Sequence, residues 1–161
     1  MNAEVALLLR AIDEAFDQKS WHGTNLRGSI RGLTAAEAQW RPAAGRHSIR
    51  EIVVHCAYWK YAVRRRLTGE KRGSFPLKGS DWFARAPGNA GWRQDITLLE
   101  DEHAKLKAAA GGLRVPQLSA HAPGSTVPFE TLLRGIAAHD LYHAGQIQLI
   151  KRLQRAGKRS R

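Results

Sequence analysis

The sequence predicts an all-α protein, an up-down bundle of four long helices with short extra helices between them. Along four segments, apolar residues recur every three or four positions, the periodicity of a helix with one buried face. Two segments begin with Ser or Thr followed three residues later by Glu, the capping box of a helix N-terminus. No segment of any length alternates apolar and polar residues as a strand does.

Residues 2–19 are expected to form the first long helix, because their apolar residues fall on one face. This apolar stripe consists of Val5, Leu8, Leu9, Ile12 and Phe16. The run Trp21-His22-Gly23 ends the helix, and residues 25–33 predict a second, short helix. Thr34, with Glu37 three residues later, is the first of the two capping boxes and opens a further helical turn.

The second long helix has the clearest start in the chain. Ser48 and Glu51 form a capping box, and the helix is expected to run to about Leu67, with Gly69 stopping it. Its buried face is expected to hold Ile49, Ile52, His55, Trp59 and either Ala62 or Val63. His55 is therefore a polar residue in an apolar stripe.

Residues 69–91 form a long connection rich in Gly and Pro, and connections this long in a compact domain are usually functional or mobile. Its aromatic residues Trp82 and Phe83 either cover a functional site or plug one end of the bundle. A third long helix is expected over residues 92–110. The fourth follows a loop at 113–127, with Pro128 at its first position.

Length and composition indicate a single domain over residues 1–155, followed by a basic tail at 156–161. No apolar run approaches the roughly 20 residues that a membrane-spanning helix needs. The first residues lack the basic-then-apolar order of a signal peptide. Because Cys56 is the single cysteine, an internal disulfide is excluded, and a reducing cytoplasm is the expected location.

The net charge of +12 comes almost entirely from two clusters of basic residues. Residues 60–72 hold six basic residues and one acid, and residues 151–161 hold six basic residues and no acid. Such clusters could attract nucleic acid or an anionic substrate. Alternatively, they are a solvated helix end and a frayed tail, and this interpretation is favoured because no nucleic-acid-binding motif accompanies the charge.

Two histidines, His139 and His143, lie in the middle of the apolar stripe of the last helix, which is expected to run to about Gln154. The stripe consists of Leu132, Ile136, His139, His143, Ile147 and Ile150. Buried polar groups are costly unless something satisfies them. Together with His55, the pair matches three imidazole ligands for zinc or a similar ion, with an open position as in catalytic sites. The alternative is three histidines that are hydrogen-bonded in the core.

Other polar residues receive less specific predictions. Asp140 is shorter than the glutamate of zinc proteases, so it is expected to support a metal ligand or to lie at the surface rather than act as a base. His22 and His47 are expected at the surface, and His103 in the core or at its rim. Tyr142 either orients a ligand or packs. Gln146 also flanks the histidine pair and could orient a ligand or substrate. Cys56 is expected to be a buried, inert thiol.

Three stretches resemble the DinB-like family of four-helix-bundle proteins: residues 32–42, residues 47–55 and residues 138–147. The last stretch, Ala-His-Asp-Leu-Tyr-His-Ala-Gly-Gln-Ile, is the most specific of the three. The resemblance implies that His55, His139 and His143 bind a divalent metal, nickel or zinc. It also implies a homodimer and, for some members, the use of a low-molecular-weight thiol whose pKa the metal lowers.

These observations lead to competing functional hypotheses. The first is a metal-dependent enzyme, a thiol-dependent transferase or a hydrolase, acting on a small-molecule substrate. The second is a non-enzymatic basic module that binds nucleic acid or an acidic partner. A third is a structural metal, or no metal, in a purely structural core. Most members of the family have no assigned reaction, so the resemblance does not select a substrate.

Overall fold

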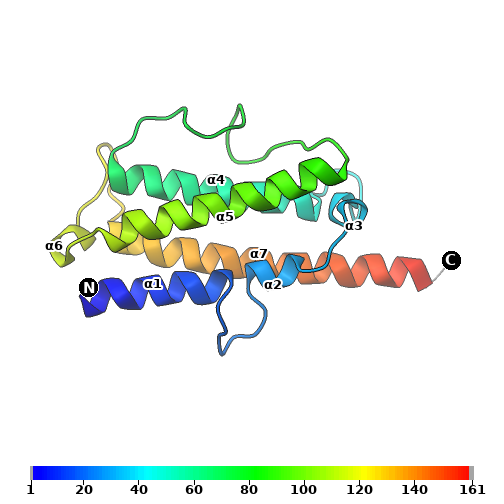
Figure 1. Ribbon diagram of the computed structural model, residues 1–161, viewed down its shortest axis with the longest axis horizontal. Coiled ribbons are helices and arrows are strands. Elements are labelled where there is room, and N and C mark those ends of the chain that lie inside the picture. Colours follow the sequence, from blue (N-terminus) through cyan, green and yellow to red (C-terminus); the bar gives the residue numbers. More distant parts are fainter. Residues whose placement is uncertain (1, 160–161) are drawn as a thin grey trace.

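The computed structural model describes residues 2–159, and for residues 158 and 159 it describes the backbone alone. Four long helices form the bundle: α1 (Ala3–Phe16), α4 (Ile49–Thr68), α5 (Asn89–Gly111) and α7 (Phe129–Arg159) (Figure 1). Three short helices are α2 (Leu26–Ile30), α3 (Ala35–Gln39) and α6 (Val115–Leu118). Within residues 2–159 there is no strand, only an isolated bridge between His121 and Pro128, so the predicted all-α bundle is confirmed.

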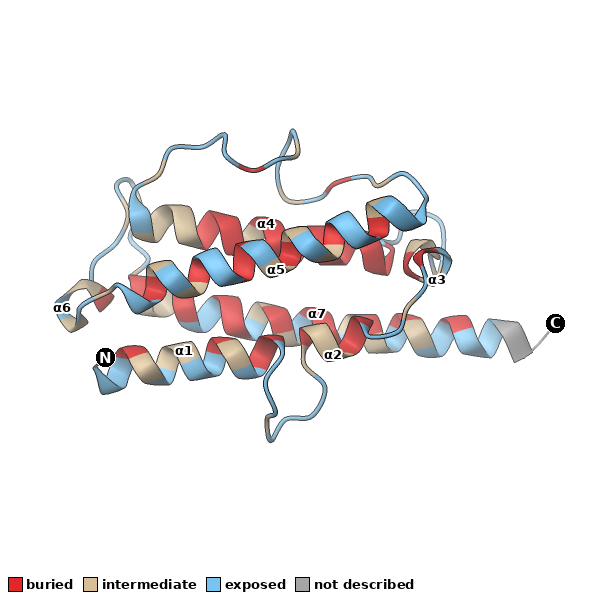
Figure 2. Ribbon diagram, viewed as in Figure 1, coloured by how far each residue is buried: buried red, intermediate tan, exposed pale blue. Residues whose placement is uncertain are grey.

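Helix α4 has two long neighbours. It packs against α5 on one side and α7 on another, while α1 and α2 follow one another along α7 (Figure 1). Buried residues, red in Figure 2, are most frequent on α4. The C-terminal part of α7 extends beyond the other helices (Figure 1).

The two middle long helices run in the same direction. Arg50, near the start of α4, forms an ion pair with Asp95, near the start of α5. Arg64, later in α4, forms an ion pair with Glu102, later in α5. Helices α1, α4, α5 and α7 therefore run up, down, down and up, so the middle two are parallel and the order is not the simple up-down alternation predicted from the sequence (Figure 1). Because two parallel neighbours cannot be joined by a tight turn, the connection between Thr68 and Asn89 must cross the length of the bundle. This crossover explains the length of the segment.

The helix ends follow the predicted signals. At the start of α4, the Ser48 side chain accepts a hydrogen bond from Glu51 N, and the Glu51 side chain accepts one from Ser48 N. Gly69 ends this helix with φ 73°, a left-handed conformation that costs glycine little. By contrast, α1 ends at Phe16 rather than at residue 19, and α7 continues past Gln154 to Arg159.

The basic cluster at residues 60–72 is partly internal, because two of its six basic side chains, Lys60 and Arg64, lie inside the bundle rather than on a solvated helix end. Lys60 is fully buried and bonds to the buried carboxylate of Asp140. Arg64 is largely buried and pairs with Glu70 and Glu102. The charges on Lys60 and Arg64 are thus satisfied inside the molecule. No helix among residues 2–159 combines the length and apolarity needed to cross a membrane.

Candidate metal centre

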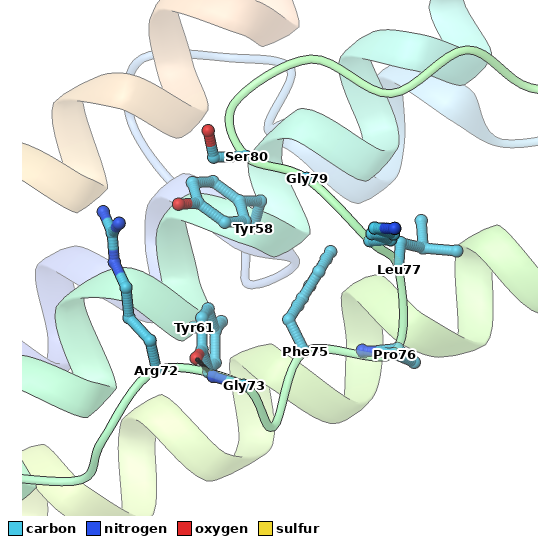
Figure 3. Close-up of a pocket in the computed structure, with 10 residues that line it drawn as sticks. Tyr58, Tyr61, Arg72, Gly73, Phe75, Pro76, Leu77, Gly79 and Ser80 are labelled. Carbon is cyan, nitrogen blue, oxygen red and sulfur yellow. Dashed lines mark hydrogen bonds between the residues drawn. The ribbon is translucent and has the colours of Figure 1, made fainter.

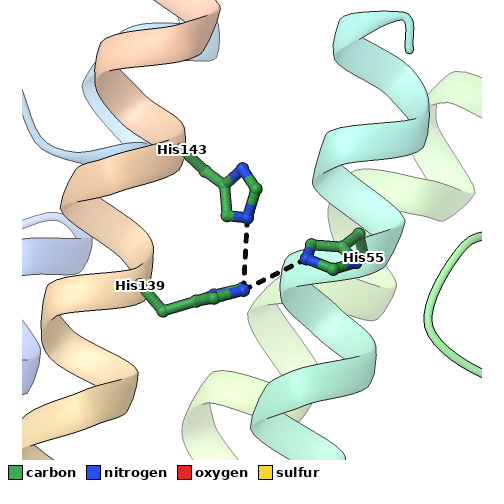
Figure 4. Close-up of side chains that lie close together, drawn as sticks. All are labelled: His55, His139 and His143. Atoms are coloured by element: carbon green, nitrogen blue, oxygen red, sulfur yellow. Dashed lines mark hydrogen bonds between the residues drawn. The ribbon is translucent and has the colours of Figure 1, made fainter. Parts of the chain in front are cut away.

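Three histidines from two helices meet at the α4–α7 contact (Figure 4). His55 comes from α4, and His139 and His143 come from consecutive turns of α7. The Nε2 atom of His139 lies 3.1 Å from Nε2 of His55 and 3.2 Å from Nε2 of His143. The structure therefore brings together the three residues that the sequence identified as candidate ligands.

The spacing of these nitrogens fits one metal ion. Imidazole nitrogens bound to a tetrahedral zinc ion at 2.0–2.1 Å are about 3.3–3.4 Å apart. The two Nε2 separations are within a few tenths of an ångström of this value. Three neutral imidazoles leave a further coordination position open, as in catalytic sites.

The hydrogen bonds on the far side of two rings show which nitrogens carry lone pairs. His55 Nδ1 lies 3.0 Å from the carbonyl oxygen of Asp81, which can only accept, so this nitrogen carries the proton. His143 Nδ1 lies 2.7 Å from Oε1 of Gln146, with the same consequence. The Nε2 lone pairs of His55 and His143 both point at Nε2 of His139.

A hydrogen-bonded core alone does not satisfy this arrangement. A single N–H on His139 Nε2 can donate well to one of its neighbours, but not to both. Its other nitrogen, Nδ1, is buried and has no hydrogen-bond partner among the described residues. A cation at the centre would satisfy all three Nε2 lone pairs at once, which favours a metal over the alternative of hydrogen-bonded histidines.

Burial keeps these imidazoles neutral, the state in which they bind metals. It lowers the pKa of His139 to about 3, with further contributions from His143 and His55. It also lowers the pKa of His143 to about 4 and shifts the pKa of His55 downward. At neutral pH each of the three rings is therefore an uncharged imidazole, with one N–H and one nitrogen lone pair.

The crossover between α4 and α5 covers the cluster. Trp82 stacks on His55 with ring centroids 3.9 Å apart, and its other face stacks on His47 at 3.6 Å. Asp81 adopts φ 66° and accepts a hydrogen bond from Trp59 Nε1 at 2.9 Å. Its carboxylate also lies 3.2 Å from His55 Nδ1. From the sequence, Trp82 and Phe83 are expected either to cover a functional site or to plug one end of the bundle. Trp82 covers the histidine cluster, whereas Phe83 is buried against Tyr58.

A groove of about 430 Å³ begins at His143 and follows the outer face of α7. It lies between this helix and the segment that precedes α4. Its walls are mostly apolar, with Arg46 as the one charged side chain. The lining residues are Pro42, Arg46, His47, Ile52, Trp82, Tyr142, His143, Gln146, Leu149, Ile150 and Leu153.

Another pocket, of about 470 Å³, lies under the crossover on a different face of α4 (Figure 3). Tyr58, Tyr61 and Phe75 line it, and Gly73 N donates a hydrogen bond to the Tyr61 hydroxyl at 3.1 Å. None of the three clustered histidines lines this pocket. The groove at His143 is therefore the one that a metal-dependent reaction could use.

The other residues that the sequence singled out are not members of the three-histidine cluster. His22 is exposed in the loop between α1 and α2. His103 is buried and stacks on Phe16 at 3.6 Å, which matches the expectation of a core residue. Tyr142 is 64% exposed and lines the groove. Cys56 is fully buried, as expected, and burial raises the pKa of its thiol well above the usual value.

Asp140 is not at the surface, which corrects one of its two expected locations. It is fully buried and bonded to Lys60. Cys56, His139 and Asp140 each offer one potential ligand atom within 4.8 Å of the others. Because the Lys60 ammonium already provides the positive charge beside this carboxylate, a second metal ion is not needed there.

Sequence reasoning missed two contributions to the site. Asp81 lies in an irregular segment whose path only the folded bundle determines. Lys60 lies one turn after Cys56 on the same face of α4, so its position on a buried face was a usable signal. Because Arg64, Arg65 and Arg66 follow it, Lys60 is interpreted from the sequence as part of a solvated basic segment.

Comparison with known families adds one match. A sequence model of the DinB superfamily matches residues 18–147, a range that contains His55, His139 and His143. Neither the curated proteins nor the solved structures contain a significant match.

Proposed function

The chain belongs to the DinB superfamily, and we propose that it is a metal-dependent enzyme whose divalent ion is held by His55, His139 and His143. The observation that carries this proposal is the convergence of three Nε2 atoms, two of which present lone pairs to the third ring. When bound, a divalent ion with an open position supplies Lewis acidity and lowers the pKa of a coordinated water or thiol.

The chain's own residues would bind the substrate and shield it from water. The groove at His143 has a volume suited to a small molecule. Its apolar walls would bind an apolar part of the substrate, and Arg46 would attract an anionic group. Trp82 covers His55 and limits the access of water from the side of the crossover.

The reaction class we favour is a thiol-dependent transfer, with hydrolysis as the other option, and nickel or zinc as the ion. This choice rests on the resemblance to family members that use low-molecular-weight thiols. A homodimer stays a prediction on the same basis, and a cytoplasmic location stays a prediction that rests on the single cysteine, Cys56. The mass of the purified protein in solution would test the dimer.

Metal analysis tests the ligand assignment. Wild-type protein purified without chelators should carry one ion per chain, and His143→Ala should lose stoichiometric metal. The control is His121→Ala, because His121 is exposed in a loop and should retain full occupancy. Full occupancy in His143→Ala would contradict the assignment.

A second experiment tests the open position. Cobalt-loaded wild type should develop a sulfur-to-cobalt charge-transfer band when a small thiol such as cysteine is added. His143→Ala should show no such band. A cobalt spectrum that no thiol and no other small ligand perturbs would favour a structural ion.

The alternative of a basic nucleic-acid-binding module has less charge available than the sequence suggested. Lys60 and Arg64 are engaged in ion pairs, and Lys151 donates a hydrogen bond to Ser29 O at 2.7 Å. Retention on a DNA column that falls steeply with salt and persists after metal removal would support that alternative.

A further inference from the structure

The three histidines differ in how their second ring nitrogen is held. Nδ1 of His55 donates to Asp81 O, and Nδ1 of His143 donates to Gln146 Oε1. Histidines that bind a metal almost always donate their other N–H to a carboxylate, a carbonyl or water. Nδ1 of His139 is buried and has no partner within the described part of the chain. This one ligand therefore lacks the contact that the other two possess.

A matching acceptor lies beside it. Asp140 is fully buried, its Oδ2 atom bonds to Lys60 Nζ, and its Oδ1 atom is a second buried polar atom without a partner among the described residues. His139 and Asp140 belong to the group whose potential ligand atoms lie within 4.8 Å of one another. Two hydrogen bonds of about 2.8 Å that meet at one water span about 4.6 Å.

We propose that Asp140 is the positioning residue for His139: it accepts the Nδ1–H hydrogen bond through one bridging water, and Lys60 holds its carboxylate in place. With Nδ1 protonated, the Nε2 lone pair of His139 points toward His55 and His143, as a metal ligand requires. The role rests on the proposed metal site.

Lys60 gives the carboxylate both charge balance and a fixed orientation. It is fully buried on α4, the helix that also carries His55, while Asp140 is on α7 next to His139. The Lys60–Asp140 pair thus joins the two helices that supply the ligands and sets their register at the site. Cys56 is the other side chain in this group, but a thiol is a weak hydrogen-bond acceptor.

The structure contains a matched control pair. Arg50 and Asp95 are 2% and 1% exposed and form an ion pair with Nε and Oδ2 2.5 Å apart. They join α4 to α5, and neither side chain is hydrogen-bonded to the three histidines. Asp95 also pairs with Arg85 through its Oδ1 atom, at 2.6 Å. Asp95→Asn and Asp140→Asn therefore remove the same charge from equally buried carboxylates, but only Asp140→Asn changes the surroundings of His139.

The test compares zinc affinity in wild type, Asp140→Asn and Asp95→Asn, measured by competition with a chromophoric chelator, with thermal unfolding of each metal-free protein. In Asp140→Asn the amide that turns its oxygen toward Lys60 presents an NH₂ group toward His139. Zinc should then bind about 10–100-fold more weakly, the range typical for loss of such a contact. Asp95→Asn should lose stability but keep its zinc affinity within about twofold.

The cobalt-loaded proteins provide a spectroscopic signature. The d–d absorption bands should change in Asp140→Asn and match wild type in Asp95→Asn. Unchanged affinity and unchanged bands in Asp140→Asn, or equal losses of affinity in both variants, would overturn the positioning role. A wild-type protein that binds no metal would instead overturn the proposed function.

A measurement on wild type decides the question if Asp140→Asn does not fold. In the zinc-loaded protein, the Nδ1–H proton of His139 should exchange with solvent as slowly as those of His55 and His143. Exchange at the rate of a free imidazole N–H would show that no partner holds it, and would refute the proposal.

Discussion

The indole of Trp82 stacks face to face on the imidazole of His55, with ring centroids 3.9 Å apart and ring planes 10° apart. His47 stacks on the opposite face of the indole at 3.6 Å. A side chain from the middle of the crossover is thus held between two histidines, one of which is a candidate metal ligand. This contact connects the irregular segment between α4 and α5 to the metal centre.

Replacing Trp82 should open the site. Trp82→Ala removes a stack worth about 0.5–1.5 kcal/mol and uncovers one face of His55. We expect a comparable loss in the free energy of unfolding and a several-fold faster release of zinc to a chelator. Trp21→Ala is the control, because Trp21 is fully exposed and should leave both quantities unchanged.

Asp81 should contribute to zinc affinity through its side chain as well as its backbone. Asp81→Ala removes the acceptor for Trp59 Nε1 and the carboxylate 3.2 Å from His55 Nδ1, while the Asp81 carbonyl remains. We expect zinc to bind up to about tenfold more weakly. Asp81→Asn keeps an acceptor and tolerates the positive φ, so it should lose less. Equal losses of zinc affinity in Asp81→Ala and Asp81→Asn would argue that the side-chain oxygen of residue 81 has no role.

The buried His103 should make the metal-free protein less stable in acid. Burial, together with Lys60 and Lys107, lowers the pKa of His103 to about 3, from the value of about 6.5 that is usual for histidine. Between these values the unfolded chain binds a proton that the folded chain does not. Stability therefore falls as the pH drops below about 6.5, by at most about 1.4 kcal/mol per pH unit for this residue.

Substitution separates the contribution of His103 from that of the other histidines. His103→Gln should flatten the dependence of unfolding free energy on pH between about pH 6.5 and 4, measured in urea on metal-free protein. The exposed His121 provides the comparison, since His121→Gln should follow the wild-type curve. A wild-type slope in His103→Gln would mean that this histidine is protonated in the folded state.

Two glycines should respond to alanine in opposite directions. Gly145 is an exposed helical residue of α7, and a Cβ there meets nothing within 4 Å, so Gly145→Ala should stabilise the protein by about 0.5–1 kcal/mol. Gly69 ends α4 with φ 73°, so Gly69→Ala should destabilise it by about 1 kcal/mol. Urea unfolding of the two variants checks both signs.

Local sequence was sufficient for the helices and for the identity of the clustered histidines. Helical periodicity depends on residues three or four positions apart, and the Ser48–Glu51 capping box depends on residues three apart. The same short-range rule put His139 above His143 on one face and placed His55 on the buried face of α4. The predicted trio then met in the structure, because buried faces of neighbouring helices must pack on each other.

Tertiary structure alone decided what surrounds these histidines. The contacts of His55 with Asp81 and Trp82, and of Lys60 with Asp140, join residues far apart in the chain. No periodicity encodes the path of an irregular crossover, and helical periodicity can place Lys60 on a buried face but cannot name the carboxylate that pairs with its ammonium. The partner that makes Lys60 tolerable in the core comes from another helix, so only the folded bundle could reveal it.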